Sequence, residues 1–128
     1  VKSRMTLSNE LYLPCEQQNA KWNENGPFGN TYYHTMKSNA DKVFYHTTLP
    51  NDASYKDIAA TFRSCDETII DNSDLLVALY PSYDWMNDAK DETALSIKHA
   101  LIQKKPVLQC LFEIKDDMPH ITGCIIIK

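Results

Sequence analysis

Glycine is scarce in this chain, with Gly26, Gly29 and Gly123 the only three among 128 residues. Folds that bind phosphate groups depend on glycine, because a residue without a side chain lets the backbone approach the phosphate closely. The shortage therefore argues against a glycine-rich phosphate loop and is the strongest negative feature of the sequence.

Clustered positive charge is also missing. Lys and Arg total 13 against 17 Asp and Glu, the net charge is −4, and Lys104-Lys105 is the only adjacent basic pair. Neutralising nucleic-acid phosphates needs clustered Lys and Arg, so we expect no general nucleic-acid binding. No run approaches the roughly 18 apolar residues that span a bilayer, and no secretory signal is recognisable at the amino terminus. We therefore predict a cytoplasmic protein with no membrane partner.

The cysteines and histidines lack metal-binding spacing. Cys15, Cys65, Cys110 and Cys124 are far apart and form no C-x-x-C pair, which disfavours zinc and dithiol redox sites. The four histidines show no metal spacing with one another. We predict no metal and no cofactor, and we interpret Cys65 and Cys110 as small buried side chains. Cys15 differs, because it follows a predicted strand and is placed to face a pocket.

Hydrophobic patterning alternates between strands and helices. The helix predicted to start at Ser54 has the clearest periodicity: Ser54 and Asp57 resemble a capping box, and apolar residues form one stripe behind it. That stripe is Ile58, Phe62, Cys65 and Ile69. Other helices are expected from the N-cap Asn30 onward and over 91–103. Strands are expected over 10–14, 42–47, 75–80 and 107–112, followed by a turn at 116–119 and an apolar run at 124–127.

This alternation predicts one α/β domain over residues 1–128, with a mainly parallel sheet and helices on both faces. The segment 75–80 is uninterruptedly apolar, as expected for a strand covered on both sides. Ligands of such sheets bind beyond the carboxyl ends of the strands. The residues predicted to gather there are Cys15, Glu16, Gln18, Trp22, Thr47, Thr48, the loop 80–85 and Asp91 to Thr93.

Two of these positions allow opposite interpretations. Trp22 suits stacking on a base or ribose beside a hydrogen bond from Gln18, but it equally suits pinning its own loop to the core. The helix start near Thr93 offers N–H groups to a phosphate. Asp91 and Glu92 are placed to satisfy those groups themselves, as a cap and a first-turn acid, and we favour this second interpretation.

Several segments together resemble the SLOG superfamily of Rossmann-like proteins, and its YpsA-like branch in particular. Pro14, Gln18 and Trp22 match a strand that ends in Pro and is followed by Gln and Trp at fixed spacing. The run 70–74 before LLVALY resembles the family's acidic-Ser-Asp turn and strand, and Thr93-Ala94, 97–100 and 105–107 follow in order. The resemblance covers roughly residues 9–112. It implies a Rossmann-like fold and the binding of nucleotides or nucleotide-derived molecules.

The chain departs from that family at three places. Asp91 and Glu92 replace the glycines of a Gly-Gly-Thr turn, and Cys65-Asp66 replaces an Arg-Asn pair, with Arg63 nearby. The family's opening strand and Ser-Gly-Gly loop have no counterpart. This predicts an N-terminally shortened domain: the chain is a fragment, another subunit completes the sheet, or the fold has been rebuilt.

The related nucleoside deoxyribosyltransferases place a nucleophilic Glu three residues after the Thr of their Thr-Ala motif, and that position is Ser96 here. Serine lacks the carboxylate that stabilises an oxocarbenium-like centre, and Glu92 is the nearest acid that could replace it. We therefore expect no catalytic residues and no enzyme.

The sequence predicts a non-catalytic sensor or binder of a nucleotide or nucleotide-derived small molecule. An N-glycosidase of the deoxyribosyltransferase kind is one alternative. A structural or assembly protein, with Tyr80, Tyr83 and Trp85 covered by another chain, is a second. We also expect a homo-oligomer or a partner chain. The predicted ligand-binding residues are Glu16, Gln18, Trp22, Arg63, Asp74, Tyr80, Asp91, Glu92 and Thr93.

Overall fold

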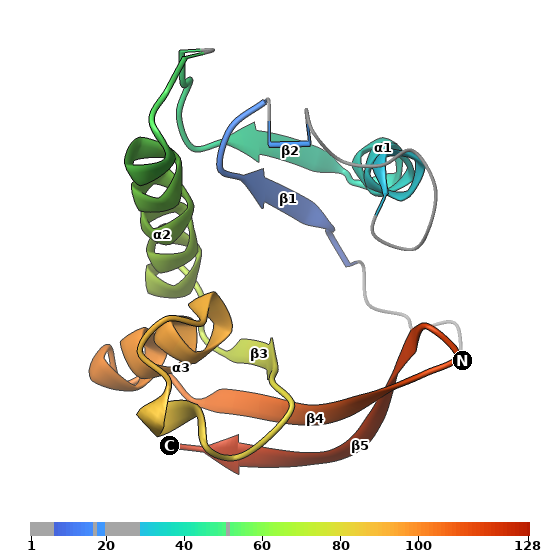
Figure 1. Cartoon of the computed structure of the whole chain (residues 1–128), viewed down its shortest axis with the longest axis vertical. Coiled ribbons are helices and arrows are strands. Elements are labelled where there is room, and N and C mark those ends of the chain that lie inside the picture. The colour runs from blue at the N-terminus through green and yellow to red at the C-terminus, as the bar shows by residue number, and fades with distance from the viewer. Residues whose placement is uncertain (1–6, 17, 20–28, 51) are drawn as a thin grey trace. The chain divides into compact units, whose positions relative to one another are not determined.

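The fold is known from a computed structural model, which describes residues 7–16, 18–19, 29–50 and 52–128. Contacts divide the chain into two compact units, Val1–Cys65 and Asp66–Lys128. Three α-helices, a 3-10 turn and five strands are assigned within the described ranges (Figure 1). The chain is thus α/β, as predicted, and each unit is described by itself. None of the described helices is both long and apolar enough to cross a membrane.

The first unit is built on a parallel strand pair. Strand β1 (Glu10–Leu13) pairs with β2 (Lys42–Tyr45), and helix α1 (Asn30–Asn39) lies between them in the chain. The N–H of Asn9 donates to Oδ2 of Asp41 at 2.6 Å, which fixes the start of both strands. Helix α1 begins at Asn30, with Gly29 as its N-cap. The predicted N-cap Asn30 is therefore wrong by one residue.

Helix α2 (Tyr55–Asp71) begins in the first unit and ends in the second. The N–H of Asp57 donates to Oγ of Ser54 at 3.1 Å, which confirms the capping role predicted for Ser54. Within the first unit Cys65 is buried, and its Sγ donates to the carbonyl of Tyr12 at 3.8 Å. The predicted apolar stripe is only partly buried, because Ile58 and Ile69 are more than a third exposed.

The second unit contains a three-stranded mixed sheet in the order β3-β4-β5. Strand β3 (Leu76–Leu79) pairs in parallel with β4 (Val107–Lys115), and helix α3 (Glu92–Ile102) provides the crossover. Strand β5 (Met118–Ile127) pairs antiparallel with β4. Asp116 and Asp117 have φ values of 52° and 60°, as in the two-residue turns that join neighbouring antiparallel strands. Parallel pairing thus holds for β1–β2 and β3–β4 but not for β5.

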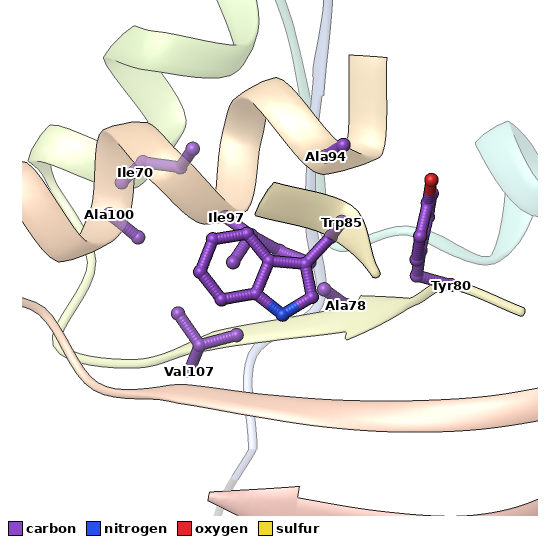
Figure 2. Packing of buried hydrophobic residues seen from close by; sticks show 8 residues of the cluster. All are labelled: Ile70, Ala78, Tyr80, Trp85, Ala94, Ile97, Ala100 and Val107. Carbon is purple, nitrogen blue, oxygen red and sulfur yellow. The ribbon is translucent and has the colours of Figure 1, made fainter. Parts of the chain in front are cut away.

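The core of the second unit lies between α3 and the sheet. Figure 2 shows the indole of Trp85 among the side chains of Ile97, Val107 and Ala78. Trp85 belongs to the 3-10 turn η1 (Trp85–Asn87), which lies with α3 on the same side of the sheet (Figure 1). Leu76, Leu101 and Ile127 pack against this cluster. The loop after β3 therefore contributes to the core as well as to the surface.

Strand β3 alternates between buried and exposed residues. Ala78 is 5% exposed, whereas Leu75, Val77 and Leu79 are 46%, 55% and 47% exposed. These exposures do not confirm the prediction of a strand covered on both faces. Within its unit, β3 is also an edge strand.

We expect Ile97→Ala to lower the free energy of unfolding by about 2–5 kcal/mol, because Ile97 is fully buried and the change leaves a cavity. Ile102→Ala, on the same helix but 75% exposed, is the matched control and should cost no more than about 0.5 kcal/mol. Urea unfolding followed by circular dichroism measures both. Equal losses would contradict the assigned core.

Candidate functional site

The loop between β3 and α3 is organised by the carboxylate of Asp88. The hydroxyl of Tyr80, the residue after β3, donates to Oδ2 of Asp88 at 2.8 Å. Oδ1 of Asp88 accepts the backbone N–H groups of Lys90 at 2.9 Å and Asp91 at 3.0 Å. The ammonium of Lys98 donates to the carbonyl oxygen of Asp88. One side chain thus joins the end of β3 to the start of α3.

These bonds shift two pKa values in opposite directions. The backbone N–H groups of Lys90 and Asp91, followed by the Tyr80 hydroxyl, hold the pKa of Asp88 below its usual value. The hydrogen bond to the Asp88 carboxylate, aided by burial, raises the pKa of Tyr80 to about 12. Tyr80 is consequently a protonated donor at neutral pH, fixed toward Asp88.

The start of α3 is capped from within the chain. Asp91 is the N-cap, and its Oδ1 accepts the N–H of Ala94 at 3.0 Å. Glu92 places a second acid in the first turn of the helix. The interpretation of Asp91 as a cap is confirmed, and its carboxylate occupies the position where a phosphate would meet this helix.

A hollow of about 320 Å³ opens along β3. All four residues of β3 line it, together with the end of α2 and the first two turns of α3. The polar lining consists of Asp66, Glu92, Thr93 and Ser96, and the apolar lining of Ile69, Ile70, Leu76, Val77, Ala78 and Leu79. The predicted residues Glu92 and Thr93 thus border a cavity that has apolar walls.

The end of α2 is held in place beside this hollow. Nε2 of His99 lies 2.7 Å from Oδ1 of Asp71, the last residue of α2. The ammonium of Lys105 donates to the carbonyls of Asp71 at 3.1 Å and Ser73 at 2.6 Å. The Lys105 ammonium is favoured there by the dipole of the helix, because it lies near the C-terminal carbonyls. His99 and Lys105 therefore position α2 against the following strand.

A more polar surface hollow of about 440 Å³ lies over the loop itself, lined by Tyr80, Ser82, Asp84, Asn87, Asp88, Ala89 and Lys90. Beneath the loop, the fully buried Gln109 donates from Nε2 to the carbonyl of Ser82 at 2.7 Å. Its Oε1 has no hydrogen-bond partner within the described part of the chain. The sequence analysis missed Gln109, although one amide inside the apolar run VLQCL is a recognisable signal.

The predicted residues of the first unit lie in less defined surroundings. Glu16 is exposed in the turn after β1, Gln18 is half-buried, and Arg63 is half-buried on α2. Burial raises the pKa of Tyr33, against the opposing effect of the nearby Lys37 ammonium. Trp22 lies outside the described residues, so neither interpretation of it is tested.

The predicted residues of the second unit fall into two places. Tyr80, Asp91, Glu92 and Thr93 belong to the loop after β3 and the start of α3, where the prediction put them. Asp74 is exposed and precedes β3, so it lies at the amino end of that strand, away from Tyr80. The described residues contain no group of three His, Cys, Asp or Glu side chains arranged to hold a metal ion.

Comparison of the chain with protein-family models, with curated proteins and with solved structures finds no match. The site is therefore interpreted from its own residues.

We expect Asp88→Asn to lower the pKa of Tyr80 from about 12 toward 10, because the variant lacks the negative carboxylate that accepts a hydrogen bond from the Tyr80 hydroxyl. A raised tyrosine pKa contributes stability that is present below pH 10 and lost as the pH rises through about 12. NMR titration of the tyrosine ring carbons, assigned with Tyr80→Phe, measures the change. Asp84→Asn is the control, since Asp84 is the smallest of the causes that raise this pKa. Equal shifts in both variants would contradict the assignment.

Proposed function

We propose that the chain binds a nucleotide-derived small molecule, and specifically an unphosphorylated nucleoside or base, without catalysis. The observation that carries the proposal is the hollow along β3, where acids and hydroxyls face apolar walls. Its volume of about 320 Å³ is at the lower end of the range for small-molecule sites, which suits a nucleoside better than a dinucleotide.

The lining supplies the two kinds of contact that a nucleoside needs. Ile69, Val77 and Leu79 offer apolar surface to the face of a base. The hydroxyls of Thr93 and Ser96 can donate or accept, and the carboxylates of Asp66 and Glu92 accept hydrogen bonds from amino groups or ribose hydroxyls. A carboxylate that accepts from a neutral donor makes a strong hydrogen bond.

The same lining disfavours phosphate. No Lys or Arg lines the hollow, and two of its four polar residues are acids. Asp91 already caps the adjacent helix. A phosphate there would lie beside the two carboxylates of this lining, which repel it. This supports a neutral ligand and accounts for the scarcity of glycine, since no backbone has to approach a phosphate.

The proposal also includes a Rossmann-like fold, association with another chain and a cytoplasmic location. The parallel β3–α3–β4 unit supports a Rossmann-like arrangement. Association with a second copy or a partner chain is part of the proposal, and the exposed apolar side chains of Leu75, before β3, and Ile126, on β5, support it. Tyr80 and Trp85 are buried within their own unit, so of the three aromatics predicted to meet another chain only Tyr83 is exposed. The cytoplasmic location is kept as part of the proposal.

We expect nucleosides to raise the melting temperature more than their monophosphates do. A ligand at about 100 times its dissociation constant adds about 2.7 kcal/mol, which shifts the melting temperature of a domain of this size by roughly 4 °C or more. Thermal-shift assays with free nucleosides, nucleoside monophosphates, NAD and ADP-ribose measure it.

Ser96→Leu should abolish the shift, because the larger side chain fills the hollow. Thr122→Leu, at an exposed position of β5, is the matched control and should retain the shift. The proposal would be wrong if no compound shifted the wild-type chain, or if monophosphates outperformed nucleosides.

An N-glycosidase is the second candidate. Ser96 stands at the position of the nucleophilic Glu of deoxyribosyltransferases, and one observation favours this candidate: the carboxylate-bearing Glu92 lines the same hollow as Ser96. Such chemistry needs a carboxylate at the sugar. If the chain hydrolyses nucleosides, Glu92→Gln should reduce the rate by at least about 100-fold, in line with losing a catalytic acid or base. Glu113→Gln on β4 is the control and should leave the rate unchanged. Base release followed by chromatography measures it, and equal rates in wild type and Glu92→Gln would exclude this candidate.

A further inference from the structure

Two cysteines that are distant in the sequence face each other across the antiparallel strands. Cys110 of β4 is the direct partner of Cys124 of β5 in the strand register. Their sulfur atoms are 3.1 Å apart, with Sγ of Cys124 donating to Sγ of Cys110. Both are free thiols in this structure. The pair belongs to one hairpin and involves none of the residues that line the hollow.

The backbone geometry at this position suits a disulfide. Directly opposed residues of an antiparallel pair have Cα atoms about 4.5 or 5.5 Å apart, depending on their hydrogen bonding. Disulfide-bonded cysteines have Cα atoms about 4.4–6.8 Å apart, so both kinds of pair fall within that range. A bond between Cys110 and Cys124 therefore needs rotation of the two side chains and no shift of either strand.

The two thiols differ in accessibility. Cys124 is exposed, whereas Cys110 is 6% exposed. The hydrogen bond with Cys124 and burial raise the pKa of Cys110 above its usual value. An external reagent thus reaches Cys124 first. Cys110 lies close enough to attack a mixed disulfide formed on Cys124.

We propose that Cys110 and Cys124 form a reversible dithiol–disulfide site that exchanges with small-molecule disulfides of the oxidised-glutathione class. The thiolate of Cys124 attacks one sulfur of the small disulfide, forming a mixed disulfide and releasing one small thiolate. Cys110 then gives its proton to solvent and attacks Sγ of Cys124, which releases the second small thiolate. Two protein thiols lose two electrons and two protons, and one small disulfide becomes two small thiols. Excess small thiol reverses both steps.

The bond would fix the last strand of the sheet. Among the described residues β5 pairs only with β4, and a register shift interrupts their pairing between Leu111 and Phe112. Ile127, near the end of β5, packs against the core. A covalent bond between Cys110 and Cys124 limits how far β5 can separate from β4. It also stabilises the fold, because it closes a loop and so lowers the entropy of the unfolded chain.

Treatment of the reduced chain with oxidised glutathione, followed by mass spectrometry, tests this proposal. The wild-type chain should lose the mass of two hydrogens and retain no stable glutathione adduct. Peptide mapping without reductant should join the peptides containing Cys110 and Cys124. Reduced glutathione should restore the original mass, and the oxidised form should melt at a higher temperature than the reduced form.

Single variants separate the two roles. Cys110→Ser should accumulate one glutathione on Cys124, because no thiol remains nearby to displace it, and Cys124→Ser should acquire neither a disulfide nor an adduct at Cys110. Cys65→Ser is the matched control and should behave as the wild type, since Cys65 is buried and its Sγ donates to the Tyr12 carbonyl instead. A stable glutathione adduct on the wild-type chain, a disulfide that involves Cys15 or Cys65, or no reaction at all would each overturn the proposal.

Discussion

The hydrogen bonds accepted by the Asp88 carboxylate hold the loop between β3 and α3 in place, and the geometry of the second unit's site depends on them. This carboxylate accepts the hydroxyl of Tyr80 at the end of β3 and the N–H groups of Lys90 and Asp91 before α3. Many α/β proteins leave such N–H groups for a bound anion at this position. Here internal carboxylates satisfy them, first Asp88 and then the cap Asp91. The same arrangement orders the loop without glycine and makes the helix start unfavourable for phosphate.

The other wall of the hollow depends on a second set of polar contacts. His99 and Lys105 hold Asp71 and the turn after α2, so the end of α2 is fixed beside β3. Asp88 and these contacts act at opposite ends of β3, and the apolar lining between them rests on the core formed by Trp85 and Ile97. Because these contacts lie within one unit, the shape of the hollow is a property of residues 66–128.

Local signals explain which elements were predicted correctly. Helix α3 has its N-cap at Asp91, where the helix was expected to start. This could be predicted because a cap and an apolar periodicity depend on residues that are close together in the sequence. The turn at 116–119 was predicted, but the antiparallel strand β5 was not, because it begins at Met118, inside that turn, and only its end, over 124–127, is a continuous apolar run. Burial of Trp85 depends on contacts with α3 and β4, which the sequence of a polar loop does not show. The facing of Cys110 and Cys124 is set by strand register, so C-x-x-C spacing did not reveal it.

Strand register also bears on how the hollow and the cysteine pair are related. Leu79, which lines the hollow, is the partner of Cys110 on β4, and Cys110 is the partner of Cys124 on β5, so the three residues form one row across the sheet. Strand β4 is paired on both edges and is the least free to move, whereas β5 is paired on one edge. A disulfide in this row therefore restrains β5 and leaves β3 where it is. Ligand binding at the hollow and thiol exchange at the hairpin should accordingly be independent.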